Sequence, residues 1–194
     1  MADEKHRLPV NTALEELVSL LSKWGLGPED YMLVDEFAYV LQKYDVKATE
    51  VESGHLDVYV NPQKLPWKDK KERSIIPPLK GGYMDKWTDF MQETGYSLDM
   101  LKAKPKILQI PTVEHRLPNG KSIRLMRVFE MTKAFVQQTL MHYSLEEVGE
   151  DKIREWIDKL GIIKEAAEKK KDNKLSELCT RKLIESKKKW RDVL

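Results

Sequence analysis

The sequence predicts an α+β protein, in which a small mixed β-sheet flanked by helices is followed by a C-terminal helical region. Three observations support this class. Up to about residue 130, short apolar runs typical of strands alternate with segments of helical spacing. Beyond it, only helical periodicity is found. The 194 residues, 41% hydrophobic and 34% charged, are enough for one core with an appendage but too few for two full domains.

We place the α/β core at 1–130 and a helical extension with a basic tail at 131–194. Within the core, 62–82 is expected to be a long surface loop, because its prolines, lysines and Gly-Gly pair interrupt regular structure. Loops of this length in a compact domain are uncommon and often functional. This one is therefore a candidate lid, although a mobile loop without function fits equally well.

Caps and spacing predict the first elements. Thr12-Ala-Leu-Glu15 has the form of a helix capping box, and apolar residues at helical spacing continue to Trp24. Tyr31–Val34 is a short apolar run typical of a buried strand. The elements expected next are a helix at 36–44, a short strand at 46–51 and an alternating strand at 55–60.

The second half of the core is expected to contain short helices at 84–93 and 98–103 and a strand at 106–110. Asn119-Gly120 is a favoured hairpin turn, and 122–128 alternates as one of its strands. The rest of the chain is expected to be helical, with helices at 129–143 and 151–160, a second capping box at 144–147, and two further stretches.

Composition sets aside several classes of protein. No run approaches the roughly 20 apolar residues that span a bilayer, so we expect a cytoplasmic protein without membrane association. Cys179, the single cysteine, cannot form an internal disulfide. The motifs of serine hydrolases, P-loop NTPases and zincins do not occur. The sequence leaves the oligomeric state open.

Two segments resemble the small nucleotidyltransferases of the polymerase-beta-like superfamily. In that family a short strand leads to a Gly-Gly or Gly-Ser turn that opens a helix, and the next strand carries D-x-D. Leu33–Val40 stands at the first place and Ser53–Val60 at the second. The resemblance covers roughly 12–130. It implies a nucleotidyltransferase-like fold and either metal-dependent transfer of a nucleotidyl group or a catalytically degenerate relative.

The resemblance also implies site residues. Two carboxylates one strand repeat apart point to the same face and hold Mg²⁺ or Mn²⁺, which orients the phosphates of a nucleoside triphosphate. Asp57 matches the second carboxylate, His55 stands at the first, and Ser53 is the cofactor-binding candidate. Gln109 falls where a third carboxylate is expected, and Glu114 is the acidic alternative. The catalytic candidates are therefore Asp57 and Glu114, and the metal-ligand candidates are His55, Asp57 and Glu114.

The chain departs from the family pattern in two places. Asp35 and Glu36 replace the glycines, which puts negative charge where the triphosphate would lie. An imidazole at His55 suits zinc or manganese better than magnesium. The alternative for Asp57 is a solvent-facing strand residue, and for His55 a polar residue beside the turn at Gly54.

A second hypothesis is a non-enzymatic interaction module that binds a partner protein or nucleic acid through its basic C-terminal helices. Lys187, Lys188 and Lys189 are the candidate phosphate contacts, and such binding would depend steeply on salt. Acidic residues interleave with the tail lysines at i,i+4 spacing, which is also typical of a solvated helix face. The tryptophans are expected to be packing anchors, and Trp67, between Pro66 and a lysine, is the one most expected to be exposed.

Overall fold

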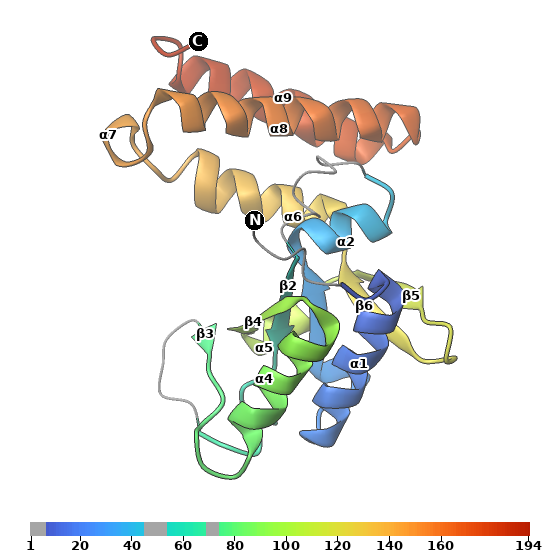
Figure 1. Cartoon of the computed structure of the whole chain (residues 1–194). Coiled ribbons are helices and arrows are strands. Elements are labelled where there is room, and N and C mark those ends of the chain that lie inside the picture. Colours follow the sequence, from blue (N-terminus) through green and yellow to red (C-terminus); the bar gives the residue numbers. More distant parts are fainter. Residues whose placement is uncertain (1–6, 45–53, 69–73) are drawn as a thin grey trace, which may run out of the picture. The chain divides into compact units, whose positions relative to one another are not determined.

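The computed structural model describes residues 7–44, 54–68 and 74–194 (Figure 1). The chain divides into two compact units. The first is made of 7–38 and the described residues of 54–126, and the second of 39–44 and 127–194. The first unit holds a six-stranded mixed sheet and the second is helical, which confirms the α+β class.

The sheet of the first unit has the strand order β3-β4-β2-β1-β6-β5. The central strand β2 pairs antiparallel with β1 and parallel with β4, while β1 pairs parallel with β6. The short β3 and the hairpin strand β5 close the two edges as antiparallel partners. The bounds are β1 Tyr31–Val34, β2 His55–Val60, β3 Ser74–Ile75, β4 Ser97–Lys102, β5 Thr112–Arg116 and β6 Ser122–Met126.

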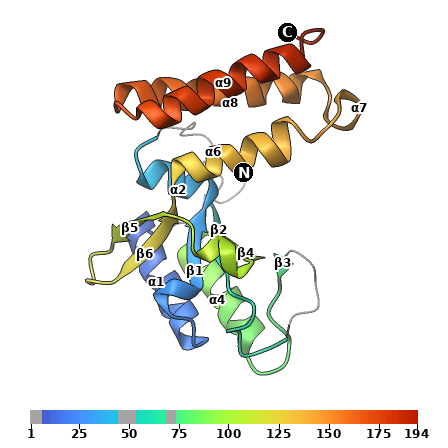
Figure 2. The same cartoon turned by 180° about the vertical axis from the view of Figure 1, so that it is seen from behind.

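Two helices, α1 (Val10–Lys23) and α4 (Tyr83–Thr94), lie on one face of this sheet, and Figure 2 shows the other face. The alternation of β2 explains the arrangement, because Leu56, Val58 and Val60 are fully buried. The intervening residues of β2 are exposed or half-buried. Polar side chains of β2 therefore lie on the face opposite the helices.

Most of the early elements are confirmed. The first two described strands, the turn at Asn119-Gly120 and β6 lie where the sequence places them, while β5 was not predicted. The first helix is confirmed, but it begins at Val10 and not at the predicted cap Thr12. The second helix, α2 (Asp35–Leu41), ends sooner than expected. The strand predicted at 46–51 lies outside the described residues. A short 3₁₀ turn, η1 (Pro28–Asp30), precedes β1.

Two predicted elements are wrong in type. Residues 97–102 form strand β4 and not a helix, because the segment pairs along its length with β2 and buries Leu98 and Met100. Tertiary pairing here overrides the helix propensity of Leu, Met and Lys. Conversely, 106–110 is not a strand, since α5 (Pro105–Leu108) begins with a proline in the first helical position.

The described part of the predicted loop 62–82 is more ordered than expected. It contains β3, which pairs with β4. Trp67 is half-buried, and its ring centroid lies 5.2 Å from that of Trp24 and 4.8 Å from that of Tyr83. The ring of Trp67 is therefore a packing anchor and not an exposed stacking surface.

The second unit is built from helices. Its long helices α8 (Glu150–Lys169) and α9 (Asn173–Lys189) pack together through buried Ile157, Leu160, Leu175 and Leu178. The capping box is confirmed at α7, where Ser144 N and Oγ donate to Glu147 Oε2 at 2.6 and 2.8 Å. The remaining elements are α6 (Val128–Phe135), the π-helical η2 (Val136–Leu140) and α7 (Leu145–Val148). Among the described helices, none combines the length and the apolar character needed to cross a membrane.

Candidate functional site

Acidic residues gather in the first unit where β1 ends and β2 and β4 run side by side. Asp57 and Asp99 are register partners on β2 and β4, so their side chains leave the same face about 5 Å apart. Val34, the last residue of β1, is the register partner of Asp57 on its other side. Asp35 and Glu36 follow directly and open α2. We call Asp35, Glu36, Asp57 and Asp99 the acidic cluster.

The cluster changes the ionisation of its most buried member. Burial raises the pKa of Asp57 to about 7, and the negative charges of Asp35, Asp99 and Glu36 add to this shift. Both causes disfavour the ionised carboxylate. A raised pKa from burial and like charge is common at sites that bind cations or move protons. Asp57 is thus half-buried and not a fully solvent-facing strand residue.

The backbone at Asp35 is unusual. Its φ of 56° lies in the left-handed region, which favours glycine and which aspartate tolerates better than most residues. The turn at Asp35 therefore adopts a conformation that is usual for glycine while it carries a carboxylate.

His55 is tied to the cluster through β4. Its Nδ1 lies 2.6 Å from Ser97 Oγ and 3.9 Å from Asp99 Oδ2. Ser97 Oγ also donates to the carbonyl oxygen of Gly54 at 3.2 Å. The imidazole is thus held at the start of β2, beside Asp99 and about half exposed.

The other candidate residues lie elsewhere. Glu114 is on β5, where it accepts a hydrogen bond from Ser122 Oγ at 2.5 Å, and strands β1 and β6 lie between β5 and β2. The structure therefore does not bring Glu114 to Asp57. Gln109 directly follows α5 and is not a strand residue. Ser53 lies outside the described residues.

Sequence reasoning missed Asp99. A signal was present, because Leu98 and Met100 flank it with strand-like alternation. That signal was short, and its Leu and Met residues also suit a helix. The partner carboxylate of Asp57 became visible only through the pairing of β4 with β2.

A bound metal would need ligands from outside the cluster. Within the described part of the chain, no three His, Cys, Asp or Glu side chains are grouped so as to hold a metal ion. Mg²⁺, however, is often held by only one or two carboxylates together with water and substrate phosphates. Asp57 and Asp99 fit this second kind of site, in which the substrate completes the coordination.

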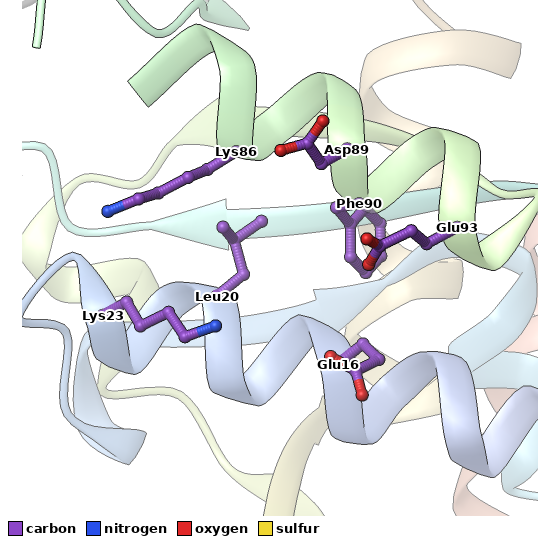
Figure 3. Close-up of a pocket in the computed structure, with 7 residues that line it drawn as sticks. All are labelled: Glu16, Leu20, Lys23, Lys86, Asp89, Phe90 and Glu93. Carbon is purple, nitrogen blue, oxygen red and sulfur yellow. The ribbon is translucent and has the colours of Figure 1, made fainter. Parts of the chain in front are cut away.

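A pocket between α1 and α4 has a different character (Figure 3). It measures about 160 Å³ and belongs to the helices that cover the opposite face of the sheet. Its charged residues have both signs and stand on exposed helix faces, which is typical of a surface groove between packed helices. They are Glu16, Lys23, Lys86, Asp89 and Glu93.

The basic tail, in the second unit, is partly used for packing. Lys189 Nζ donates to the carbonyl oxygens of Met141 at 2.8 Å and Tyr143 at 3.0 Å. The lysine side chain thus caps the backbone that follows η2. Lys187 and Lys188 are exposed. The three lysines therefore do not form one uniform phosphate-binding group.

The chain matches no protein-family model, no curated protein and no solved structure.

Proposed function

We propose that the first unit is a nucleotidyltransferase-like domain that binds a nucleoside triphosphate together with Mg²⁺ or Mn²⁺ at Asp57 and Asp99. The observation that carries the proposal is the register pairing of these two aspartates on parallel neighbouring strands. It sets two carboxylates on one face of the sheet, next to the turn at Asp35 that resembles the family's glycine turn.

The charge of the acidic cluster supports a site that binds the nucleotide and the divalent cation only together. The acidic cluster repels phosphates, and its own members repel one another, which adds to the effect of burial in raising the pKa of Asp57. A divalent cation relieves both repulsions. Nucleotide binding is therefore expected to require the cation, and the cation to bind more tightly with the nucleotide, because such a coupling is reciprocal.

The residues then have distinct roles. When bound, the cation would neutralise charge on the phosphates during transfer. Asp57 and Asp99 would hold the cation, and His55, next to Asp99, would accept a proton. Asp35 and Glu36 add charge that weakens nucleotide affinity. In a catalytically degenerate relative the same cluster would bind the nucleotide without transferring it.

The test is thermal unfolding with Mg²⁺ or Mn²⁺, with each nucleoside triphosphate, and with both. A ligand present at 100 times its Kd stabilises the folded state by about 2.7 kcal/mol, which raises Tm by several degrees. We expect this rise only with both ligands, and we expect Asp57→Asn and Asp99→Asn to abolish it. Glu114→Gln, a matched loss of one carboxylate on a distant strand, should keep it.

No rise with any pair of ligands would contradict the proposal. An equal loss in Glu114→Gln would contradict the assignment of the site to Asp57 and Asp99. Release of pyrophosphate in the stabilised sample separates a working transferase from a degenerate one.

The interaction module is the second candidate, favoured by the exposed Lys187 and Lys188. Their replacement by glutamate should weaken binding of RNA or DNA at low salt if α9 contacts phosphates. Lys189 is left intact in this variant, because its side chain caps η2. Unchanged affinity would remove the support for this candidate.

A further inference from the structure

Helix α9 of the second unit has an inner and an outer face of different character. The inner face packs on α8 (Figures 1 and 2), where Leu175 and Leu178 are buried. On the outer face, Ile184 leaves 66% of its surface exposed, more than any other large apolar side chain in the described helices. An open groove of about 380 Å³ runs along this face, and its described lining residues all belong to α9. They are Ser176, Glu177, Thr180, Arg181, Ile184 and Glu185.

The outer face has the residue spacing of a helix that packs against another helix. Glu177, Arg181, Ile184 and Lys188 are four, three and four residues apart, which places them in one row along the helix. All four are exposed. The row runs from an acidic residue to a basic one, with the exposed isoleucine between them.

This row is complementary to a second copy of itself in the reverse direction. If two copies of α9 pack antiparallel about a two-fold axis near Leu183, residues equally far before and after the axis face each other. Glu177 of one copy then lies opposite Lys188 of the other. Arg181 lies opposite Ile184, where the apolar stem of the arginine covers the isoleucine. In a parallel pair, by contrast, each charged residue would face its own copy and be repelled.

The two charged residues at the ends of this row have no competing partner in the described part of the chain. Neither the Glu177 nor the Lys188 side chain makes a hydrogen bond or an ion pair there. Lys189, the next residue, is instead held by the carbonyl oxygens of Met141 and Tyr143. Contacts with a second copy would therefore cost Glu177 and Lys188 no interaction within the chain.

We propose that the outer face of α9 binds a second copy of this chain, as an antiparallel two-fold pair centred near Leu183. The helix has 17 residues, so it is about 26 Å long and about 10 Å wide. One face of this size is smaller than the roughly 800 Å² that each partner buries in a stable interface of standard size. The dimer is therefore weak and forms at high protein concentration. It does not depend on the function proposed for the first unit.

Self-association is measured first, by sedimentation equilibrium of the full chain from about 10 µM to about 1 mM at low salt. We expect the mean mass to rise from that of a monomer toward that of a dimer, and to rise less at about 0.5 M salt, because salt screens exposed charges. Ile184→Ser should weaken association by at least about tenfold, since the isoleucine is buried in both copies of the pair. Glu165→Lys, a charge reversal at an exposed residue of α8, is the control and should associate as wild type.

The antiparallel register is tested with two charge reversals. Glu177→Lys sets two lysines opposite each other, and Lys188→Glu sets two glutamates opposite each other. Each variant alone should associate about tenfold more weakly than wild type, because repulsion replaces attraction at two symmetric contacts. An equal mixture of the two variants restores opposite charges at both contacts and should associate about as strongly as wild type.

The mixture is followed by NMR with only one variant labelled. Unlabelled Lys188→Glu should shift the amides of Thr180 and Ile184 in ¹⁵N-labelled Glu177→Lys, while added unlabelled Glu177→Lys should not. The formal net charge of the chain is +2, so neither variant becomes net negative. General attraction between oppositely charged proteins therefore does not explain the rescue.

Three outcomes would overturn the proposal. The first is a wild-type chain that stays monomeric over the whole concentration range. The second is a mixture of the two variants that associates no more strongly than either variant alone. The third is a monomeric chain in which a short RNA or DNA at low salt shifts the amides of Thr180 and Ile184, because the occupant of this face would then be a nucleic acid.

Discussion

Asp57 should make the stability of the protein depend on pH. Its folded-state pKa of about 7 lies above the usual value of 3.8, so between these two values the folded chain binds more protons than the unfolded chain. By linkage, this carboxyl contributes to the free energy of unfolding. The contribution is fully present at the acidic end of this pH window and is lost as pH rises toward 7. The side chain introduced in the variant Asp57→Asn cannot ionise. We therefore expect this variant to lose less stability than wild type as pH rises through this range.

Between wild type and Asp57→Asn, the loss of stability over this pH range is expected to differ by about 1 kcal/mol. The difference is small because the partial exposure of Asp57 screens its interactions with the other carboxylates. Urea unfolding at about pH 4, 5.5 and 7.5 measures it. Glu114→Gln serves as the control and should follow the wild-type profile. Parallel profiles for wild type and Asp57→Asn would show that the pKa of Asp57 is not raised by the fold.

Asp35 combines backbone strain with charge, and two variants separate these effects. Asp35→Gly and Asp35→Ala remove the same carboxylate and whatever it contacts, but only glycine adopts a φ of 56° without cost. We expect the glycine variant to be more stable than the alanine variant by about 1 kcal/mol in urea unfolding. Equal stability would mean that the turn relaxes to negative φ.

Removing the Asp35 carboxylate also removes a cause of the raised pKa of Asp57. The pH dependence described above should then be smaller in both Asp35 variants. The glycine variant comes nearer to the family's turn, so any cation-dependent nucleotide affinity should rise in it. A fall in that affinity would show that Asp35 takes part in binding.

At the scale of elements, the sequence predicted those whose signal is local. The alternation of His55–Val60 and the Asn119-Gly120 turn placed β2, the hairpin turn and β6 correctly. Strand β4 was missed because Ser97–Lys102 has helix-forming residues, and only its pairing with β2 makes it a strand. Half of the carboxylate pair was therefore predictable, and Asp99 was not.

The end of η2 offers a prediction about the basic tail. Lys189 donates to two backbone carbonyl oxygens and lies 4.3 Å over the ring of Trp190. Because these carbonyls end a helical segment, Lys189→Met should lower the free energy of unfolding by about 1 kcal/mol. Lys188→Met, a matched change at an exposed lysine, should have no measurable effect. Denaturant unfolding measures both, and equal values would show that the cap contributes nothing.

At the scale of the whole molecule, the two units carry the two functional hypotheses separately. The acidic cluster belongs to the first unit, while the exposed Lys187 and Lys188 belong to the second. A ligand that binds one unit slows local opening there, since it stabilises the closed state that it contacts. Hydrogen exchange can therefore assign each ligand to a unit without knowledge of the reaction.

We expect Mn²⁺ with a nucleoside triphosphate to slow exchange in His55–Val60 and Ser97–Lys102 and to leave Asn173–Lys189 unchanged. Asp57→Asn should abolish this protection, because it removes one of the two carboxylates that would hold the cation. A short RNA or DNA at low salt is the second arm, and the interaction module requires it to protect α9. If the nucleotide protected α9 alone, the ligand site would lie in the second unit. The function would then be electrostatic binding on a helix face and not phosphate chemistry at a carboxylate pair.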